Sequence, residues 1–404
     1  MMDQAKRRVV KNMFSLLSLK GVDVLVPLVV TPYLVRVVGL EKFGLIAFSL
    51  SFAAYFGALI NYGFNITAAR DIARCRESGE EVSRIYSNTM AAIGILSVFT
   101  LLLSSMLIAL MNVDEWLFFG AVFLVIFQSS LPVWMFVGHE RMTLVAVLGA
   151  FSKVVYVFSL FALVQSEDDY IYVNALYAAS ALLTLILSMV LVKLLLKVNF
   201  SGGGVKGVKS SFKSGFSVFV MQVSPVLYNN SSTFILGLVA APAAVGVYSA
   251  AMRVVEVCIT LGRLIANAFL PYVAVDMRSR HGYFAKLMLL IGGVATLMTF
   301  VFSEFISTLL YSTEGAQVAI WLEWLSPSIL FGFFYLVYGV GYMPLAGQEK
   351  AAAKISLTVS LVGLLMLLVF VPMFYLMAVV LVLVGSRFLL AVISYCYYRK
   401  SLLV

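Results

Sequence analysis

Long runs of apolar residues follow one another along the chain, with only short polar segments between them. Twelve of these runs approach or exceed the roughly 20 mostly apolar residues that a helix needs to cross a bilayer. The expected spans cover roughly residues 12–39, 43–68, 85–111, 116–138, 143–165, 171–196, 213–238, 244–275, 284–311, 317–343, 352–374 and 376–398. The pattern therefore predicts an all-α polytopic membrane protein with twelve transmembrane helices.

The composition excludes a soluble protein. The chain is 62% hydrophobic and 12% charged, with a mean hydropathy of +1.03, whereas soluble domains carry about 25% charged residues. The three cysteines are scattered and match neither a disulfide framework nor a zinc site. We therefore expect no metal and no bound cofactor.

Basic residues lie in every second gap between the expected spans. These gaps and the two ends of the chain contain Lys6, Arg7, Arg8, Lys11, Arg70, Arg74, Arg76, Arg84, Arg141, Lys193, Lys197, Lys206, Lys209, Lys213, Arg278, Arg280, Lys286, Lys350, Lys354, Arg399 and Lys400. The opposite gaps contain mainly acidic residues, with Lys42 as their one base. By the positive-inside rule, both termini are expected to be cytoplasmic. The net charge of +9 is then explained by topology and contact with anionic membrane lipids, and we expect no nucleic-acid partner.

Short motifs recur in the two halves of the chain. Gly138-His139-Glu140-Arg141 is echoed 209 residues later by Gly347-Gln348-Glu349-Lys350. Phe43-Gly44 opens the second span much as Val245-Gly246 opens the eighth. The common order of these echoes predicts two homologous six-helix bundles of the same orientation, which is the plan of a parallel-repeat transporter.

The expected domains are an N-terminal bundle at 1–198, a flexible cytoplasmic linker at 199–213 and a C-terminal bundle at 214–404. The linker is rich in Gly, Ser and Lys, which is typical of flexible connections. Its glycines at 202, 204 and 207 satisfy G-x-G-x-x-G, but no strand precedes them, so a dinucleotide site is not favoured.

Six basic residues fall within the expected spans: Lys20, Arg36, Lys153, Arg253, Arg263 and Arg387. A charge at the bilayer centre costs about 2.5–3.5 kcal/mol on insertion scales, so such residues usually face a watery cavity or a partner. Arg36 lies near a helix end, and this position favours a role as an anchor at the lipid head groups. For Lys153 and Arg387, a cavity role and a polar contact between helices both remain open.

The eighth span carries the most distinctive pattern. Counted at 100° per residue, five side chains fall within an arc of about 80° along roughly 20 Å of helix. They are Arg253, Glu256, Thr260, Arg263 and Asn267, here called the polar stripe. Such a stripe on an otherwise apolar helix indicates a water-accessible face.

These charges define the candidate site. We expect Arg253, Arg263, Lys20, Lys153, Asn267 and Asn229 to bind substrate, and Asp23 and Glu256 to couple transport to an ion. The alternative is that Lys20 with Asp23, and Arg253 with Glu256, are neutral structural pairs. That alternative leaves an excess of basic residues at depth, which would attract an anion, and arginine suits phosphate because its planar fork donates paired hydrogen bonds.

The run Pro32-Tyr33-Leu34-Val35-Arg36-Val37-Val38-Gly39-Leu40-Glu41-Lys42-Phe43-Gly44, preceded by Pro27-Leu28, carries a family resemblance. With Asn61-Tyr62-Gly63-Phe64, Ala69-Arg70 and the Gly347-Gln348-Glu349-Lys350 turn, it resembles O-antigen repeat-unit flippases of the Wzx type. These belong to the polysaccharide-transport branch of the multidrug, oligosaccharidyl-lipid and polysaccharide exporter superfamily.

The resemblance implies a V-shaped pair of bundles with a cationic central cavity in the bacterial cytoplasmic (inner) membrane. The implied substrate is undecaprenyl-pyrophosphate-linked oligosaccharide, carried from the cytoplasmic to the periplasmic leaflet by alternating access. A proton or sodium gradient would drive the step, and an O-antigen polymerase and a chain-length regulator are the expected protein partners.

Two other functions remain as alternatives. A cation-drug exporter, or another exporter of the same superfamily, would share the topology, but a drug-cation cavity predicts acidic residues rather than the basic ones found here. An O-antigen polymerase or ligase would need a large outward loop, whereas the outward gaps are short. We therefore expect the protein not to be an enzyme and assign no catalytic residue.

Overall fold

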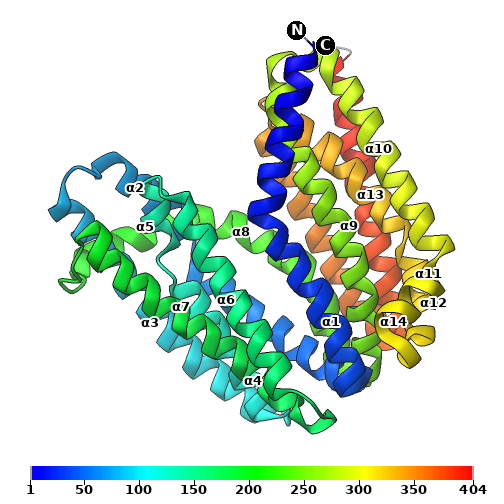
Figure 1. Cartoon of the computed structure of the whole chain (residues 1–404), viewed down its shortest axis with the longest axis horizontal. Helices are drawn as coiled ribbons and strands as arrows, with labels where there is room; N and C mark the ends of the chain where they lie inside the picture. The colour runs from blue at the N-terminus through cyan, green and yellow to red at the C-terminus, as the bar shows by residue number, and fades with distance from the viewer. Residues whose placement is uncertain (1, 403–404) are drawn as a thin grey trace. The chain divides into compact units, whose positions relative to one another are not determined.

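The computed structural model is built from helices, and the described residues contain no strand (Figure 1). It describes the backbone of residues 2–402, and the side chains of residues 21, 25–220, 222, 226–227, 230–277 and 279–401. The predicted all-α membrane architecture is confirmed.

The helices follow one another with short connections. In chain order they are α1 (Met2–Asn61), α2 (Phe64–Cys75), α3 (Gly79–Met111), α4 (Glu115–Ser130), α5 (Val133–Gly138), α6 (Met142–Leu163), η1 (Glu167–Ile171), α7 (Tyr172–Leu196), α8 (Val205–Val239), α9 (Pro242–Val275), α10 (Met277–Val301), α11 (Ser303–Tyr311), η2 (Ser312–Glu314), α12 (Gly315–Leu325), α13 (Pro327–Tyr335), η3 (Leu336–Tyr342) and α14 (Glu349–Leu402). Each expected span lies on one or more of these helices.

Within the described residues, eight helical segments are long and apolar enough to cross a membrane, and a bent pair raises the number to nine. Two of the segments are long enough to contain two expected spans each. The helix α1 breaks at Gly39, whose φ of 77° favours a residue without a Cβ, and α14 breaks at Tyr375. The twelve-span prediction is consistent with these breaks.

The chain forms two compact units. Unit 1 comprises Met1–Ala47 and Leu227–Val404, and unit 2 comprises Phe48–Val226. These units follow packing, whereas the expected domains follow the sequence repeat, so the boundaries at 198 and 214 stay a prediction. In the expected linker, residues 205–213 belong to α8.

In unit 1, α9, α10, α13 and α14 pack against one another (Figure 1). The start of α9 also crosses α1 at very close range. A Cβ added at Gly44 would overlap the carbonyl oxygen of Pro242, and one added at Gly246 would overlap that of Leu40. Glycine at both positions therefore lets the two backbones touch.

In unit 2, α7 packs between α4 and α6. The Asn174 side chain of α7 is 1% exposed, and its Nδ2 donates to Ser49 Oγ at 2.7 Å and to the Leu117 carbonyl at 3.0 Å. Since buried polar groups are costly without hydrogen bonds, Asn174 fixes α1, α4 and α7 relative to one another.

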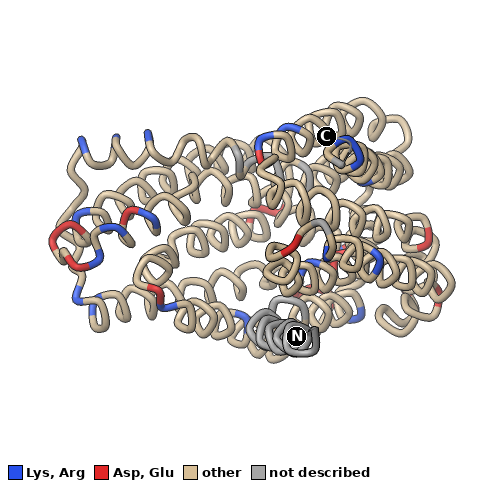
Figure 2. The backbone as a smooth tube through the Cα atoms, turned by 90° about the horizontal axis from the view of Figure 1, so that it is seen from above, with Lys and Arg blue, Asp and Glu red and all other residues tan. Residues whose placement is uncertain are grey.

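The two ends of unit 2 differ in their charged residues. The end where α2 finishes and α3 and α8 begin carries arginines and lysines together with acidic residues such as Glu77, Glu80 and Glu81 (Figure 2). At the other end, Asp114 caps α4 by accepting from the Leu117 amide at 3.2 Å, and the Tyr170 hydroxyl donates to Asp114 at 2.9 Å. Because the long helices join these ends, the basic residues of unit 2 are concentrated at one end of the unit.

Candidate functional site

The helix α9 places the polar stripe on one side of unit 1. Pro242 occupies the first turn, where its missing N–H costs nothing. Between Gly262 and Ala268, every second residue is buried, whereas Arg263 and Asn267 are exposed. The other members of the polar stripe, Arg253, Glu256 and Thr260, are half-buried.

Arg253 and Glu256 form an ion pair one turn apart on this helix. Nη1 of Arg253 lies 3.1 Å from Oε2 of Glu256, and the side chains are 37% and 46% exposed. The Nε of Arg253 is buried and has no hydrogen-bond partner in the described part of the chain. The pairing matches the alternative of a neutral pair, but the guanidinium keeps an unused donor.

Arg263 differs from Arg253 in having no carboxylate partner. It is exposed, and among the residues whose side chains are described, none forms an ion pair with it. Asn267, one turn further along, is also exposed. The second half of the polar stripe therefore presents an unneutralised cation beside an amide donor.

The other predicted site residues are not gathered around this stripe within one unit. Lys153 lies half-buried on α6 in unit 2, whereas Arg253 and Arg263 belong to unit 1. Lys20, Asp23 and Asn229 lie outside the residues whose side chains are described. Their roles remain predictions.

Arg387 holds two helices together. It is 9% exposed, and its Nη1 on α14 donates to Ser328 Oγ on α13 at 3.0 Å. The same hydroxyl donates to the Leu325 carbonyl at 2.6 Å. Of the two roles left open by the sequence, this geometry fits the contact between helices.

Arg36 binds the end of another helix. Its Nε donates to the Leu310 carbonyl at 2.8 Å, and its Nη2 donates to the Leu309 carbonyl. These carbonyls belong to the last turn of α11, where helix ends leave acceptors unsatisfied and favour positive charge. The sequence offered no signal for this contact, because its partner is backbone 273 residues away.

A second polar region of the structure was not predicted from the sequence. Thr67, Arg84 and Lys206 line a pocket in unit 2 formed by α2, α3 and α8. They come from three separate helices, so only the fold brings them together. No group of histidine, cysteine or acidic side chains that could hold a metal occurs among the described residues.

Comparison with known proteins identifies the family of this chain. Residues 9–277, more than half of its length, match the family described as "Polysaccharide biosynthesis protein". The chain belongs to this family. Two relatives named "Putative O-antigen transporter" align with it, one from Escherichia coli (strain K12) and one from Shigella dysenteriae. The first is 25% identical over 98% of this chain and 97% of its own, and the second is 26% identical over 60% and 61%.

Solved structures share the fold of this family member. A multidrug resistance MATE family transporter of the MOP superfamily, in an inward-facing conformation, aligns with a TM-score of 0.66 and 14% identity over 94% of this chain and 98% of its own. The lipid II flippase MurJ aligns equally well, with a TM-score of 0.66 and 14% identity over 92% and 87%. The predicted resemblance to polysaccharide transporters is supported by the family match and the two O-antigen transporter relatives, and these solved structures show that the fold is shared.

Proposed function

We propose that this protein is a flippase for undecaprenyl-pyrophosphate-linked oligosaccharide, the repeat unit of O-antigen. It moves this lipid from the cytoplasmic to the periplasmic leaflet of the bacterial inner membrane. Membership of the polysaccharide biosynthesis family and the names of the two relatives support this substrate class. The relatives are named as transporters, which supports a protein that moves its substrate without chemical conversion.

The observation that carries the proposal is the exposed guanidinium of Arg263 within the polar stripe of α9, which forms no ion pair with any side chain that the structure describes. A diphosphate is a compact double anion with several acceptor oxygens, and an arginine fork can donate two hydrogen bonds to it. Asn267 adds an amide that suits diphosphate or sugar oxygens. The lipid tail needs no protein site, because it stays in the bilayer.

The Arg253 and Glu256 pair supplies a way to release the substrate. Glu256 competes with a phosphate oxygen for Arg253, and protonation of the carboxylate or binding of sodium to it changes that competition. Alternating access of two six-helix halves would expose the site first to one side and then to the other. Asp23 is the second candidate for ion coupling, and Lys20, Lys153 and Asn229 are further candidates for substrate contact.

The charge pattern supports an orientation with both termini in the cytoplasm. In that orientation the substrate enters from the leaflet where lipid-linked sugars are assembled. An O-antigen polymerase and a chain-length regulator would then act on the transported product, and they are the protein partners we propose.

Complementation of a bacterial strain that lacks its own O-antigen exporter tests the proposal. The wild-type chain should restore surface polysaccharide, and Arg263→Ala should abolish it while the protein remains in the membrane. Arg74→Ala is the matched control, because Arg74 is an exposed arginine of the α2 end, outside the polar stripe.

Two results would overturn the proposal. One is normal polysaccharide in the Arg263→Ala strain, and the other is a wild-type chain that exports cationic drugs but restores no polysaccharide. The second result would support the drug-exporter alternative of the same superfamily.

A further inference from the structure

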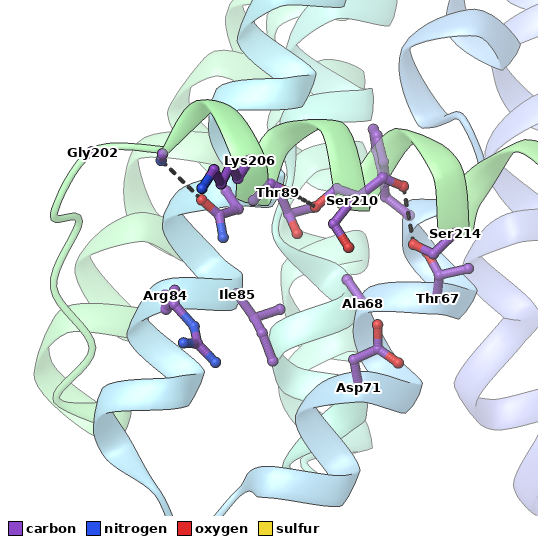
Figure 3. Close-up of a pocket in the computed structure, with 15 residues that line it drawn as sticks. Thr67, Ala68, Asp71, Arg84, Ile85, Thr89, Gly202, Lys206, Ser210 and Ser214 are labelled. Atoms are coloured by element: carbon purple, nitrogen blue, oxygen red, sulfur yellow. Dashed lines mark hydrogen bonds between the residues drawn. The ribbon is translucent and has the colours of Figure 1, made fainter.

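A pocket of about 620 Å³ opens in unit 2 between the first turns of α8 and the facing ends of α2 and α3 (Figure 3). It lies far along the sequence from the polar stripe and within a different unit. Its lining is predominantly polar or glycine, and includes Thr67, Asp71, Arg84, Thr89, Lys206 and Ser210. A concave site with convergent polar groups is typical of a ligand-binding site.

Two cations reach this pocket from different helices. Arg84 belongs to the first turns of α3 and Lys206 to the first turn of α8 (Figure 3). Arg84 lies 3.8 Å from Glu81, but its side chain is 71% exposed, and such an exposed pair contributes little. Lys206 is exposed, and the described side chains include no ion-pair partner for it. Both charges are therefore available to a ligand.

The single acidic residue of the lining does not cancel these charges. Asp71 stands against the two cations Arg84 and Lys206 in the lining, and Nη2 and Nε of its neighbour Arg70 lie 2.9 and 3.0 Å from its Oδ1. The pocket thus keeps a positive excess.

Hydroxyl groups complete the lining. Thr89 is 2% exposed and lines the pocket near Ser210 (Figure 3). Its hydroxyl can donate a hydrogen bond as well as accept one. A ligand that supplies acceptor oxygens can therefore accept hydrogen bonds from Thr89 and from both cations.

The loop that closes the pocket is held by hydrogen bonds rather than free. The Ser201 amide donates to Ser87 Oγ at 2.9 Å, and the Gly204 amide donates to Asn88 Oδ1 at 3.1 Å. Both acceptors belong to α3. The glycine-rich segment therefore fixes the start of α8, and with it Lys206, over the pocket.

From this geometry we infer that the pocket binds a phosphate-bearing group. Arg84 and Lys206 neutralise the charge, and Thr89 and Ser210 donate hydrogen bonds to the remaining oxygens. The pocket lies at the end of unit 2 where basic residues gather (Figure 2). An anionic lipid headgroup and a free phosphate or diphosphate present the same chemistry to these side chains.

Two binding measurements on the full chain distinguish the sources. The protein is placed in phosphatidylcholine nanodiscs and titrated calorimetrically with inorganic pyrophosphate. In parallel, retention of phosphatidic acid is measured by native mass spectrometry after exchange from mixed micelles. Both measurements use the Arg263→Ala background, which removes the proposed substrate contact on α9, so failure of one site is separated from failure of the other.

Lys206→Gln should weaken binding roughly tenfold, because it removes a charge-assisted hydrogen bond, and Thr89→Val should weaken it less. Lys209→Gln is the matched control, since Lys209 is exposed on the same helix but does not line the pocket. Loss confined to the pyrophosphate measurement assigns a free phosphate, and loss confined to phosphatidic acid assigns a lipid headgroup. Equal loss in Lys206→Gln and Lys209→Gln, or no binding in either measurement, would overturn the inference.

Discussion

Gly44 and Gly246 occupy reciprocal positions where α1 crosses α9. Each backbone lies so close to the other helix that a Cβ at either glycine would overlap a carbonyl oxygen, that of Pro242 for Gly44 and that of Leu40 for Gly246. Gly44 and Gly246 are separated by 202 residues in the chain, and so are Leu40 and Pro242. Such mutual contact is what a two-fold relation between repeated segments produces, so the motif echo read from the sequence also describes a contact.

Replacement of either glycine by alanine should destabilise unit 1. We expect Gly246→Ala to lower the free energy of unfolding by about 1–3 kcal/mol, because the added methyl group forces the backbones apart. Thermal unfolding of the purified protein in detergent measures this. Gly293→Ala on α10 is the control, since an added Cβ there meets nothing within 4 Å. Equal melting temperatures for the two variants would show that the crossing is not tight.

The contact between Arg387 and Ser328 predicts a second stability effect. Ser328→Ala leaves a buried guanidinium without its acceptor and should cost about 1.5–3 kcal/mol. Adding Arg387→Leu should recover part of the loss, because it removes the unsatisfied charge. Ser105→Ala controls for loss of a hydroxyl, because Ser105 bonds within its own helix, to the Leu101 carbonyl. If the double variant were less stable than Ser328→Ala alone, the contact would not be the reason.

Arg36 should stabilise the end of α11 through both of its hydrogen bonds. Arg36→Gln removes the charge and is expected to lower stability by about 1–2 kcal/mol. Arg36→Lys should retain only part of this, because lysine lacks the fork that reaches two adjacent carbonyls. Melting temperatures of the three proteins should therefore rank arginine, lysine and glutamine, and a lysine variant as stable as the wild type would refute the role of the fork.

The proposed coupling through Glu256 predicts a change in the response to ion gradients. Glu256→Gln keeps the shape of the side chain but can no longer exchange a proton or bind sodium through a carboxylate. Transport into proteoliposomes should then become insensitive to an imposed proton or sodium gradient. Asp23→Asn is the parallel variant for the other proposed carboxylate. Retained sensitivity in both variants would place coupling elsewhere.

The sequence predicted the helical membrane fold well because the signal is physical and local. A segment must be apolar over its whole length to cross a bilayer, and the polar stripe on α9 could be placed by helical periodicity alone. The family resemblance also rested on residues with visible structural roles, such as Gly39, whose positive φ permits the break in α1.

Contacts between distant segments could not be predicted from the sequence. The Arg387 contact with Ser328 and the Arg36 contact with α11 join residues 59 and about 270 positions apart. No pattern within one helix encodes such a partner. For the same reason, the composition of the segment before α8 predicted only a flexible linker. In the structure, hydrogen bonds join Ser201 and Gly204 of that segment to α3.

In the transport that we propose, the guanidinium of Arg263 binds the diphosphate of the lipid. Purified protein in proteoliposomes should flip undecaprenyl-pyrophosphate-linked oligosaccharide at a rate that falls roughly tenfold or more in Arg263→Gln, since a charge-assisted hydrogen bond is lost. The rate should remain unchanged in Arg74→Gln, which removes the same charge outside the polar stripe. Equal flipping rates for Arg263→Gln and the wild type would contradict the account.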